Sequence, residues 1–241
     1  MYFTDQLEEN MAWLNQALHV DKNFDVVYRV LTIADKKACL YFIDGFTKDD
    51  SLLKILQGFS SIKADDMPED AHSFSKKYLP YGEIGLLSDS REMIIQLLSG
   101  VSCLFIDGYN KCLTIDCRTY PARGVSEPEK DKVMRGSRDG FVETLVFNTA
   151  LIRRRIRDPK LIMEILTAGE SSHTDIAMCY MEGRADKKLI EKIRKSAELN
   201  TAILDEVARQ IHVGMSTQEI DDIVYRFTKE HGGIPAPLNY Q

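Results

Sequence analysis

Seven arginines in the middle of the 241-residue sequence are the residues best suited to bind another molecule. They are Arg123, Arg135, Arg138, Arg153, Arg154, Arg155 and Arg157. Residues 118–157 contain ten Arg or Lys against five Asp or Glu, a difference of +5 in a chain whose net charge is −6. A local basic patch of this kind can face phospholipid headgroups or an acidic partner. The alternative is salt bridging within the domain to Glu127, Asp139, Glu143 and Asp158.

A predicted helix carries the last four of these arginines. Its apolar stripe consists of Phe141, Leu145, Ile152 and Ile156, widened by Val142, Val146 and Leu151. The helix is expected to end at Asp158, because the following Pro159 disfavours helical geometry there. Consecutive helical residues point about 100° apart, so Arg153, Arg154 and Arg155 fan around the helix end, where cations also suit the helix dipole.

The run that contains these arginines is the most distinctive in the chain. Residues 120–159 read YPARGVSEPEKDKVMRGSRDGFVETLVFNTALIRRRIRDP. The pattern EP..D..MRG.RDGF.E....N.ALIRRRIRDP resembles the signature of the bacterial spore germination family, which contains the A subunits of nutrient germinant receptors and stage V sporulation AF-like proteins. A later segment, SSHTDIAMCYMEG, resembles the family's S.TD.A..Y segment. The resemblance covers roughly residues 15–192.

The resemblance implies a function without enzyme chemistry. In this family a soluble N-terminal region precedes several membrane helices, so the parent protein is expected at the cytoplasmic face of the spore inner membrane. The implied partners are other spore germination membrane subunits, with an anionic lipid surface as a further candidate. The seven arginines are the expected contact patch. Nothing in the sequence identifies a small-molecule ligand, although the cleft between two α/β halves is where one would be expected.

Net charge, cysteine content and hydropathy argue against several other classes of function. The net charge of −6 argues against a nucleic-acid partner, because phosphate recognition needs a positive surface. Five cysteines, an odd number without a signal peptide, indicate thiols in a reducing compartment. Cys112 and Cys117 would point to opposite faces of one strand, and we expect no metal or cofactor site. No apolar run approaches the roughly 20 residues that span a bilayer, so the chain itself is expected to be soluble.

The element pattern predicts a mixed α+β fold of the α/β class, with two small α/β subdomains and a helical C-terminal tail. The expected boundaries are 1–80, 81–186 and 187–241. In the first subdomain we expect a helix over 5–18, strands over 26–33 and 38–43, a helix from Asp49, and a loop over 63–80. In the second we expect a strand over 82–87, a helix over 90–98, and a hairpin of 101–106 and 111–117.

Aspartates mark several of the predicted turns and helix starts. Asp44 and Asp107 each follow a buried strand and precede glycine, and turn formation explains both better than catalysis does. Asp158 can cap a second helix that begins at Pro159 and runs to Gly169. Residues 174–180 then alternate as a strand does.

The tail carries a second resemblance. Residues 191–241, EKIRKSAELNTAILDEVARQIHVGMSTQEIDDIVYRFTKEHGGIPAPLNYQ, resemble the N-terminal part of a type I methionine aminopeptidase. That family holds two metal ions with two aspartates, a histidine and two glutamates, which the resemblance places after Gln241. The alternative function, a truncated aminopeptidase fusion, is therefore expected to be inactive, because no metal-activated water can form. A seam near residue 191 would make the tail a graft.

Local patterns predict two amphipathic helices in the tail. Asp186 can cap a long helix from Lys187, and Ser216 with Glu219 can form a capping box for the next helix. The apolar face of the long helix consists of Ile193, Ala197, Asn200, Leu204, Val207 and Ile211. Because exposed apolar stripes favour association, we expect the tail to dock on residues 1–185 or to self-associate.

Overall fold

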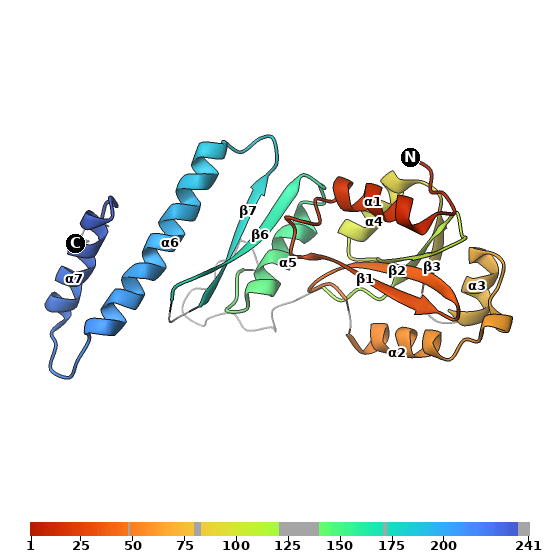
Figure 1. Cartoon of the computed structure of the whole chain (residues 1–241), viewed down its shortest axis with the longest axis horizontal. Helices are drawn as coiled ribbons and strands as arrows, with labels where there is room; N and C mark the ends of the chain where they lie inside the picture. The colour runs from red at the N-terminus through yellow and green to blue at the C-terminus, as the bar shows by residue number, and fades with distance from the viewer. Residues whose placement is uncertain (48, 80–82, 121–139, 171–172, 236–241) are drawn as a thin grey trace, which may run out of the picture. The chain divides into compact units, whose positions relative to one another are not determined.

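The structure is a computed structural model that describes residues 1–47, 49–79, 83–120, 140–170 and 173–235. Its chain divides into two compact units, Met1–Glu164 and Ile165–Gln241. Figure 1 shows their helices and strands in chain order. The mixed α/β class expected from the sequence is confirmed, and the described strands of the larger sheet pair in antiparallel fashion.

A five-stranded sheet forms the centre of the Met1–Glu164 unit. Its strand order is β1-β2-β4-β5-β3. The strands are β1 (Val26–Ile33), β2 (Lys36–Ile43), β3 (Glu83–Leu87), β4 (Ser102–Ile106) and β5 (Cys112–Asp116). β2 pairs with β4, with Tyr41 opposite Cys103. Strands from residues 1–47 and strands from residues 83–120 therefore belong to one sheet.

Helices cover both faces of this sheet (Figure 1). α1 (Leu7–Ala17) and α4 (Ser90–Leu98) lie on one face, and α2 (Asp49–Ser60) and α3 (Ala71–Tyr78) lie on the other. The alternation of β2 serves both faces, because Tyr41 and Ile43 belong to one buried apolar cluster and Ala38 and Leu40 to the other. The result is a three-layer α/β/α unit.

Aspartate side chains start two of these helices. Asp89 accepts a hydrogen bond from the N–H of Arg91 at 2.7 Å at the start of α4. Asp107, in the turn after β4, accepts one from the N–H of Leu7 at 3.1 Å, and so satisfies the first turn of α1 across 100 residues of sequence. Its role in this structure is to hold a turn and a helix start together.

Residues 63–80 differ from the predicted loop. They contain a 3-10 turn at Ala64–Asp66 and the helix α3. Asp70 caps α3 by accepting a hydrogen bond from the N–H of Ser73 at 2.9 Å. Phe74 is fully buried against Phe59, with ring centres 5.7 Å apart. One capped turn and one buried aromatic side chain make this segment helical, although its sequence is polar.

The Ile165–Gln241 unit contains a two-stranded sheet and two helices. β6 (Leu161–Ala168), whose first residues belong to the first unit, pairs with β7 (Thr174–Met181). α6 (Lys187–Gln210) and α7 (Thr217–Glu230) follow. The capping box of Ser216 and Glu219 at α7 is confirmed. Within the described residues, no helix combines the length and apolar character needed to cross a bilayer.

The helix expected from Pro159 to Gly169 is wrong, because β6 occupies most of that range. Asp158 does accept a backbone hydrogen bond as a capping residue would, from the N–H of Lys160 at 2.9 Å. The chain after it forms a turn and becomes extended. The segment is a strand because it pairs with β7, and local capping residues do not predict such pairing.

Candidate functional site

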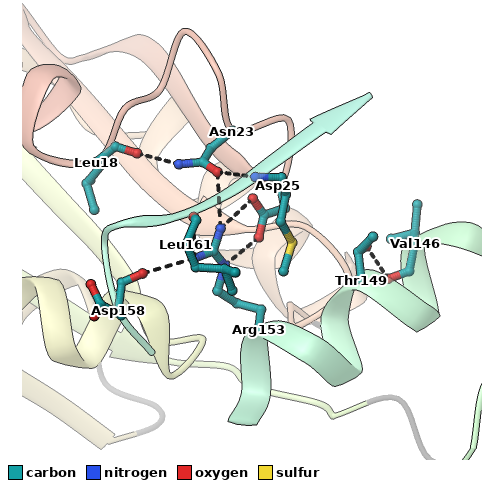
Figure 2. A network of polar contacts seen from close by, with 9 residues as sticks. Leu18, Asn23, Asp25, Val146, Thr149, Arg153, Asp158 and Leu161 are labelled. Atoms are coloured by element: carbon teal, nitrogen blue, oxygen red, sulfur yellow. Dashed lines mark hydrogen bonds and ion pairs between the residues drawn. The ribbon is translucent and has the colours of Figure 1, made fainter. Parts of the chain in front are cut away.

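Arg153, in the last turn of α5 (Leu145–Arg155), is fully buried. Its guanidinium donates to both carboxylate oxygens of Asp25, from Nε to Oδ2 at 2.7 Å and from Nη2 to Oδ1 at 3.0 Å. Nη2 also donates to Oδ1 of Asn23 at 3.3 Å, and Nη1 donates to the backbone oxygens of Leu161 at 3.1 Å and Asp158 at 3.4 Å. The guanidinium thus makes five hydrogen bonds, as many as it has N–H donors (Figure 2).

Asn23 extends this network to two further backbone segments. Its side-chain nitrogen donates to the backbone oxygen of Leu18 at 2.7 Å, and its side-chain oxygen accepts from the N–H of Met163 at 2.7 Å (Figure 2). The network therefore joins the end of α1, the turn before β1, α5 and the start of β6. Removing one member of a buried ion pair costs about 3–5 kcal/mol, because the other charge stays buried without a counterion.

The buried face of α5 differs from the one that the sequence predicts. Phe141 and Ile156, on the predicted apolar stripe, are exposed, whereas Thr149, Ala150 and Arg153 are buried. Apolar periodicity fails here because the buried face of α5 meets polar acceptors, namely the carboxylate of Asp25 and backbone oxygens.

A glycine turn allows α5 to approach the sheet closely. Gly45 follows β2 and has a φ of +79°, a backbone conformation that residues with a side chain rarely adopt. A Cβ atom at Gly45 would lie 3.1 Å from Cγ1 of Val146 and 3.2 Å from Cβ of Ala150. The Asp44-Gly45 turn predicted from the sequence is therefore also the contact surface for α5.

The next arginines along the chain face solvent. Arg154, Arg155 and Arg157 are exposed. The guanidinium of Arg154 lies over the ring of Tyr120, 4.4 Å from its centre, in a cation–π contact. Nε of Arg157 donates to the backbone oxygen of Arg154 at 3.3 Å. The helix end thus sends one arginine into the core and presents three on the surface.

The remaining predicted site residues, Arg123, Arg135 and Arg138, lie outside the described residues. So do Glu127 and Asp139, two of the acids proposed as intramolecular partners. The partner of the buried Arg153 is instead Asp25. Sequence reasoning missed Asp25 and Asn23, because a polar turn before a strand has the composition of many surface loops.

Burial and hydrogen bonding shift the pKa values of several other side chains in this unit. Burial raises the pKa of Cys39 to about 12 and raises that of Cys112 well above its ordinary value, so both remain neutral thiols. The hydrogen bond from Arg118 lowers the pKa of the partly exposed Asp116. Across the described part of the chain, no three His, Cys, Asp or Glu side chains are grouped as metal ligands would be.

The sequence pattern of a known family spans both units. The family described as "GerA: Bacillus/Clostridium GerA spore germination protein" matches residues 12–218. The chain belongs to the GerA family. The resemblance seen in the arginine-rich run is therefore confirmed.

Curated GerA relatives extend beyond this chain. Stage V sporulation protein AF of Bacillus subtilis is 34% identical over 188 residues, which cover 78% of this chain and 38% of the relative. Spore germination protein B1 of the same organism is 29% identical over 201 residues, covering 81% and 40%. The chain thus spans less than half the length of these relatives.

A solved structure shares the fold. It is the N-terminal domain of the A subunit of the Bacillus megaterium spore germinant receptor GerK3, with a TM-score of 0.66 and 20% identity. The similarity covers 92% of this chain and 80% of that domain.

The tail also has a short match outside the GerA family. Methionine aminopeptidase 1A of Arabidopsis thaliana is 43% identical over 51 residues, covering 21% of this chain and 13% of the enzyme. The GerA pattern nevertheless continues to residue 218, beyond the seam expected near residue 191. α6 crosses that seam as one uninterrupted helix.

Proposed function

We propose that this chain is a non-enzymatic assembly module of a spore germination membrane protein, positioned at the cytoplasmic face of the spore inner membrane. The observation that carries the proposal is the contrast between buried and exposed arginines at the end of α5 in a GerA family member. Arg153 makes five hydrogen bonds inside the unit, which fix the position of the helix end. Arg154, Arg155 and Arg157 are exposed.

The surface beside these arginines suits a protein partner. Phe147 and Ile156 expose 47% and 40% of their surface on and beside α5. Exposed aromatic and arginine side chains are enriched among the residues that dominate protein–protein binding. We propose that other germination membrane subunits bind here, through acidic groups for the arginines and apolar groups for Phe147. Arg123, Arg135 and Arg138 belong to the same proposal on the strength of the sequence.

The test is co-purification of the tagged full-length parent protein from sporulating cells, with partner subunits counted by mass spectrometry. Arg155→Ala with Arg157→Ala is expected to reduce partner recovery several-fold while the melting temperature of the purified chain is unchanged. Lys54→Ala with Lys63→Ala, two exposed cations elsewhere on the same unit, is the matched control. Equal recovery for both variants would refute the contact role of the arginines. Arg153 is unsuitable for this test, because its loss is expected to destabilise the first unit.

The short aminopeptidase match supports a second candidate, a metal-dependent aminopeptidase fusion. The resemblance implies that the metal ligands would come from sequence after Gln241, so the chain studied alone should not release methionine from peptides. Release of methionine in the presence of Co²⁺ or Mn²⁺ would contradict the non-enzymatic role.

A further inference from the structure

The N-terminal half of α6 presents cations and apolar side chains together. Residues 184–195 contain six Arg or Lys against two Asp or Glu, a difference of +4 in a chain of net charge −6. Lys187, Lys188, Lys192 and Lys195 are all exposed. Leu189 and Ile193, between them in sequence, expose 53% and 48% of their surface. The buried residues of α6, Thr201, Ile203 and Asp205, all lie in its other half.

Helical geometry arranges these side chains as an apolar stripe with cations around the rest of the helix. At about 100° per residue, Leu189 and Ile193 point within about 40° of each other. Lys188, Lys192 and Lys195 fall within about 60° of one another, about 60–160° around the helix from that stripe. Lys187 and Arg194 fall within about 20° of each other, about 100–160° from the stripe in the other direction. Such a distribution is characteristic of helices that lie in the plane of a membrane interface.

The lysines of the first turn are unfavourably placed in the helix that carries them. Lys187 and Lys188 occupy its first turn, where the helix dipole disfavours cations and where α6 has no acidic residue. Lys188 and Lys192 are a like-charged pair four residues apart, which is unfavourable on a helix. The ion pair of Arg194 with Glu191, at 3.1 Å, offsets this charge only in part. Asp186 caps this turn by accepting a hydrogen bond from the N–H of Lys188 at 2.9 Å, and the excess of cations nevertheless remains. A charge excess that local stability does not require is typical of a functional site.

The same lysines line a groove of about 900 Å³. Its other side is the segment after α7, where a Cβ atom on Gly233 would lie 2.7 Å from Cδ2 of Leu199. That segment therefore packs on α6, and Ile234 beyond it exposes 91% of its surface at the groove. The groove brings four ammonium groups and one carboxylate, that of Glu191, together with the apolar side chains of Leu199 and Ile234. Its excess of cations suits an anionic ligand.

We propose that this end of α6 docks on an anionic phospholipid surface. The lysine ammonium groups contact headgroup phosphates, and Leu189 and Ile193 enter the boundary between headgroups and acyl chains. Charge complementarity favours an anionic surface, and the half-exposed apolar stripe favours a lipid over a purely acidic polypeptide. The site is distinct from the arginines of α5 and does not depend on subunit assembly.

The experiment is co-sedimentation of the 241-residue chain with vesicles made of equal parts phosphatidylcholine and phosphatidylglycerol, with pure phosphatidylcholine vesicles as the reference. The chain should bind the anionic vesicles, and added salt should weaken the binding. Lys188→Gln with Lys192→Gln should lower the partition coefficient roughly 25-fold, at about fivefold for each lysine. The same variant should keep or raise its melting temperature, because it removes a like-charged pair. Leu189→Ser with Ile193→Ser should also weaken binding.

Two control variants locate the effect. Lys54→Gln with Lys63→Gln should bind as the unaltered chain does, and so should Arg154→Gln with Arg155→Gln. Absence of binding to anionic vesicles, or an equal loss in the lysine and arginine variants, would overturn the assignment. Binding to polyglutamate without binding to vesicles would assign the groove to an acidic protein instead, and would also overturn it. None of these outcomes changes partner recovery in the co-purification experiment, so the two proposals fail separately.

Discussion

In the Met1–Glu164 unit, helices cover both faces of a five-stranded sheet, whereas in the Ile165–Gln241 unit two long helices accompany a sheet of two strands. The first unit buries an arginine with all its hydrogen bonds made. The second leaves apolar side chains exposed along α6, among them Leu189 and Leu204 at 53% and 59%. Amphipathic helices occur in both units, so the difference lies in how much sheet is available to cover them. Stability should therefore be concentrated in the first unit.

The largest expected effect is that of removing the buried arginine. Arg153→Met leaves the carboxylate of Asp25 buried without a counterion and should lower the free energy of unfolding by about 3–5 kcal/mol. Trp13, the only tryptophan in the chain, packs against the apolar cluster under α1, so its fluorescence in a urea titration reports on the first unit.

The neighbouring arginine supplies the control for that measurement. Arg154→Met removes one exposed cation–π contact and should cost only about 0.5–1 kcal/mol. The double variant Arg153→Met with Asp25→Leu should recover much of the lost stability, because the uncompensated charge is gone. Equal losses for Arg153→Met and Arg154→Met would show that the buried network stabilises the first unit no more than one exposed contact does.

A smaller effect is expected at the turn that receives α5. Gly45→Ala places a side chain at φ +79° and against Val146 and Ala150, which should cost about 2–3 kcal/mol from backbone strain and crowding together. Gly58→Ala is the matched control, because a Cβ atom there meets nothing within 4 Å and α2 should gain about 0.5–1 kcal/mol. Urea titrations followed by Trp13 fluorescence compare the two. A harmless Gly45→Ala would mean that α5 is not held against the sheet.

The smallest effect should be confined to the second unit. Ser216 accepts a hydrogen bond from the N–H of Glu219 at 3.3 Å, and Ser216→Ala should destabilise α7 by about 1 kcal/mol. Hydrogen exchange read by mass spectrometry should show faster exchange in α7 and unchanged exchange in β2. Faster exchange in β2 as well would show that the two units unfold together.

The capping box also has a predictable pH dependence. Hydrogen bonds from the backbone and side chain of Ser216 lower the pKa of Glu219 below its ordinary value of 4.5. The contribution of the Glu219 carboxylate is therefore complete above pH 4.5 and is lost as the pH falls through the lowered pKa. The difference in α7 exchange between Ser216→Ala and the unaltered chain should shrink in the same range.

Elements with a clear period were predictable from the sequence. β1 and α4 occupy the predicted residues, because alternation in one and capped helical spacing in the other are local properties. The helix α3 was missed because a single buried aromatic residue, Phe74, anchors it. β6 was predicted as a helix because Asp158 and Pro159 give a strong local start signal, while pairing with β7 is a long-range property.

The arginine site was predicted only in part, for a related reason. Sequence composition located the cluster, and the family resemblance gave it a function. The separation of Arg153 from Arg154 depends on Asp25, which lies 128 residues earlier in the chain. Helical spacing alone gave both residues a place at the surface of the helix end. Only the partner across the fold shows which of them enters the core.

That separation also has a consequence for synthesis. The ribosome releases Asp25 long before Arg153, and at 5–20 residues per second the interval is roughly 6–25 s. During this time the carboxylate of Asp25 has no counterion from Arg153. We expect the nascent chain to stay open at this point until Arg153 emerges, and a chain truncated before residue 153 should be more sensitive to proteases.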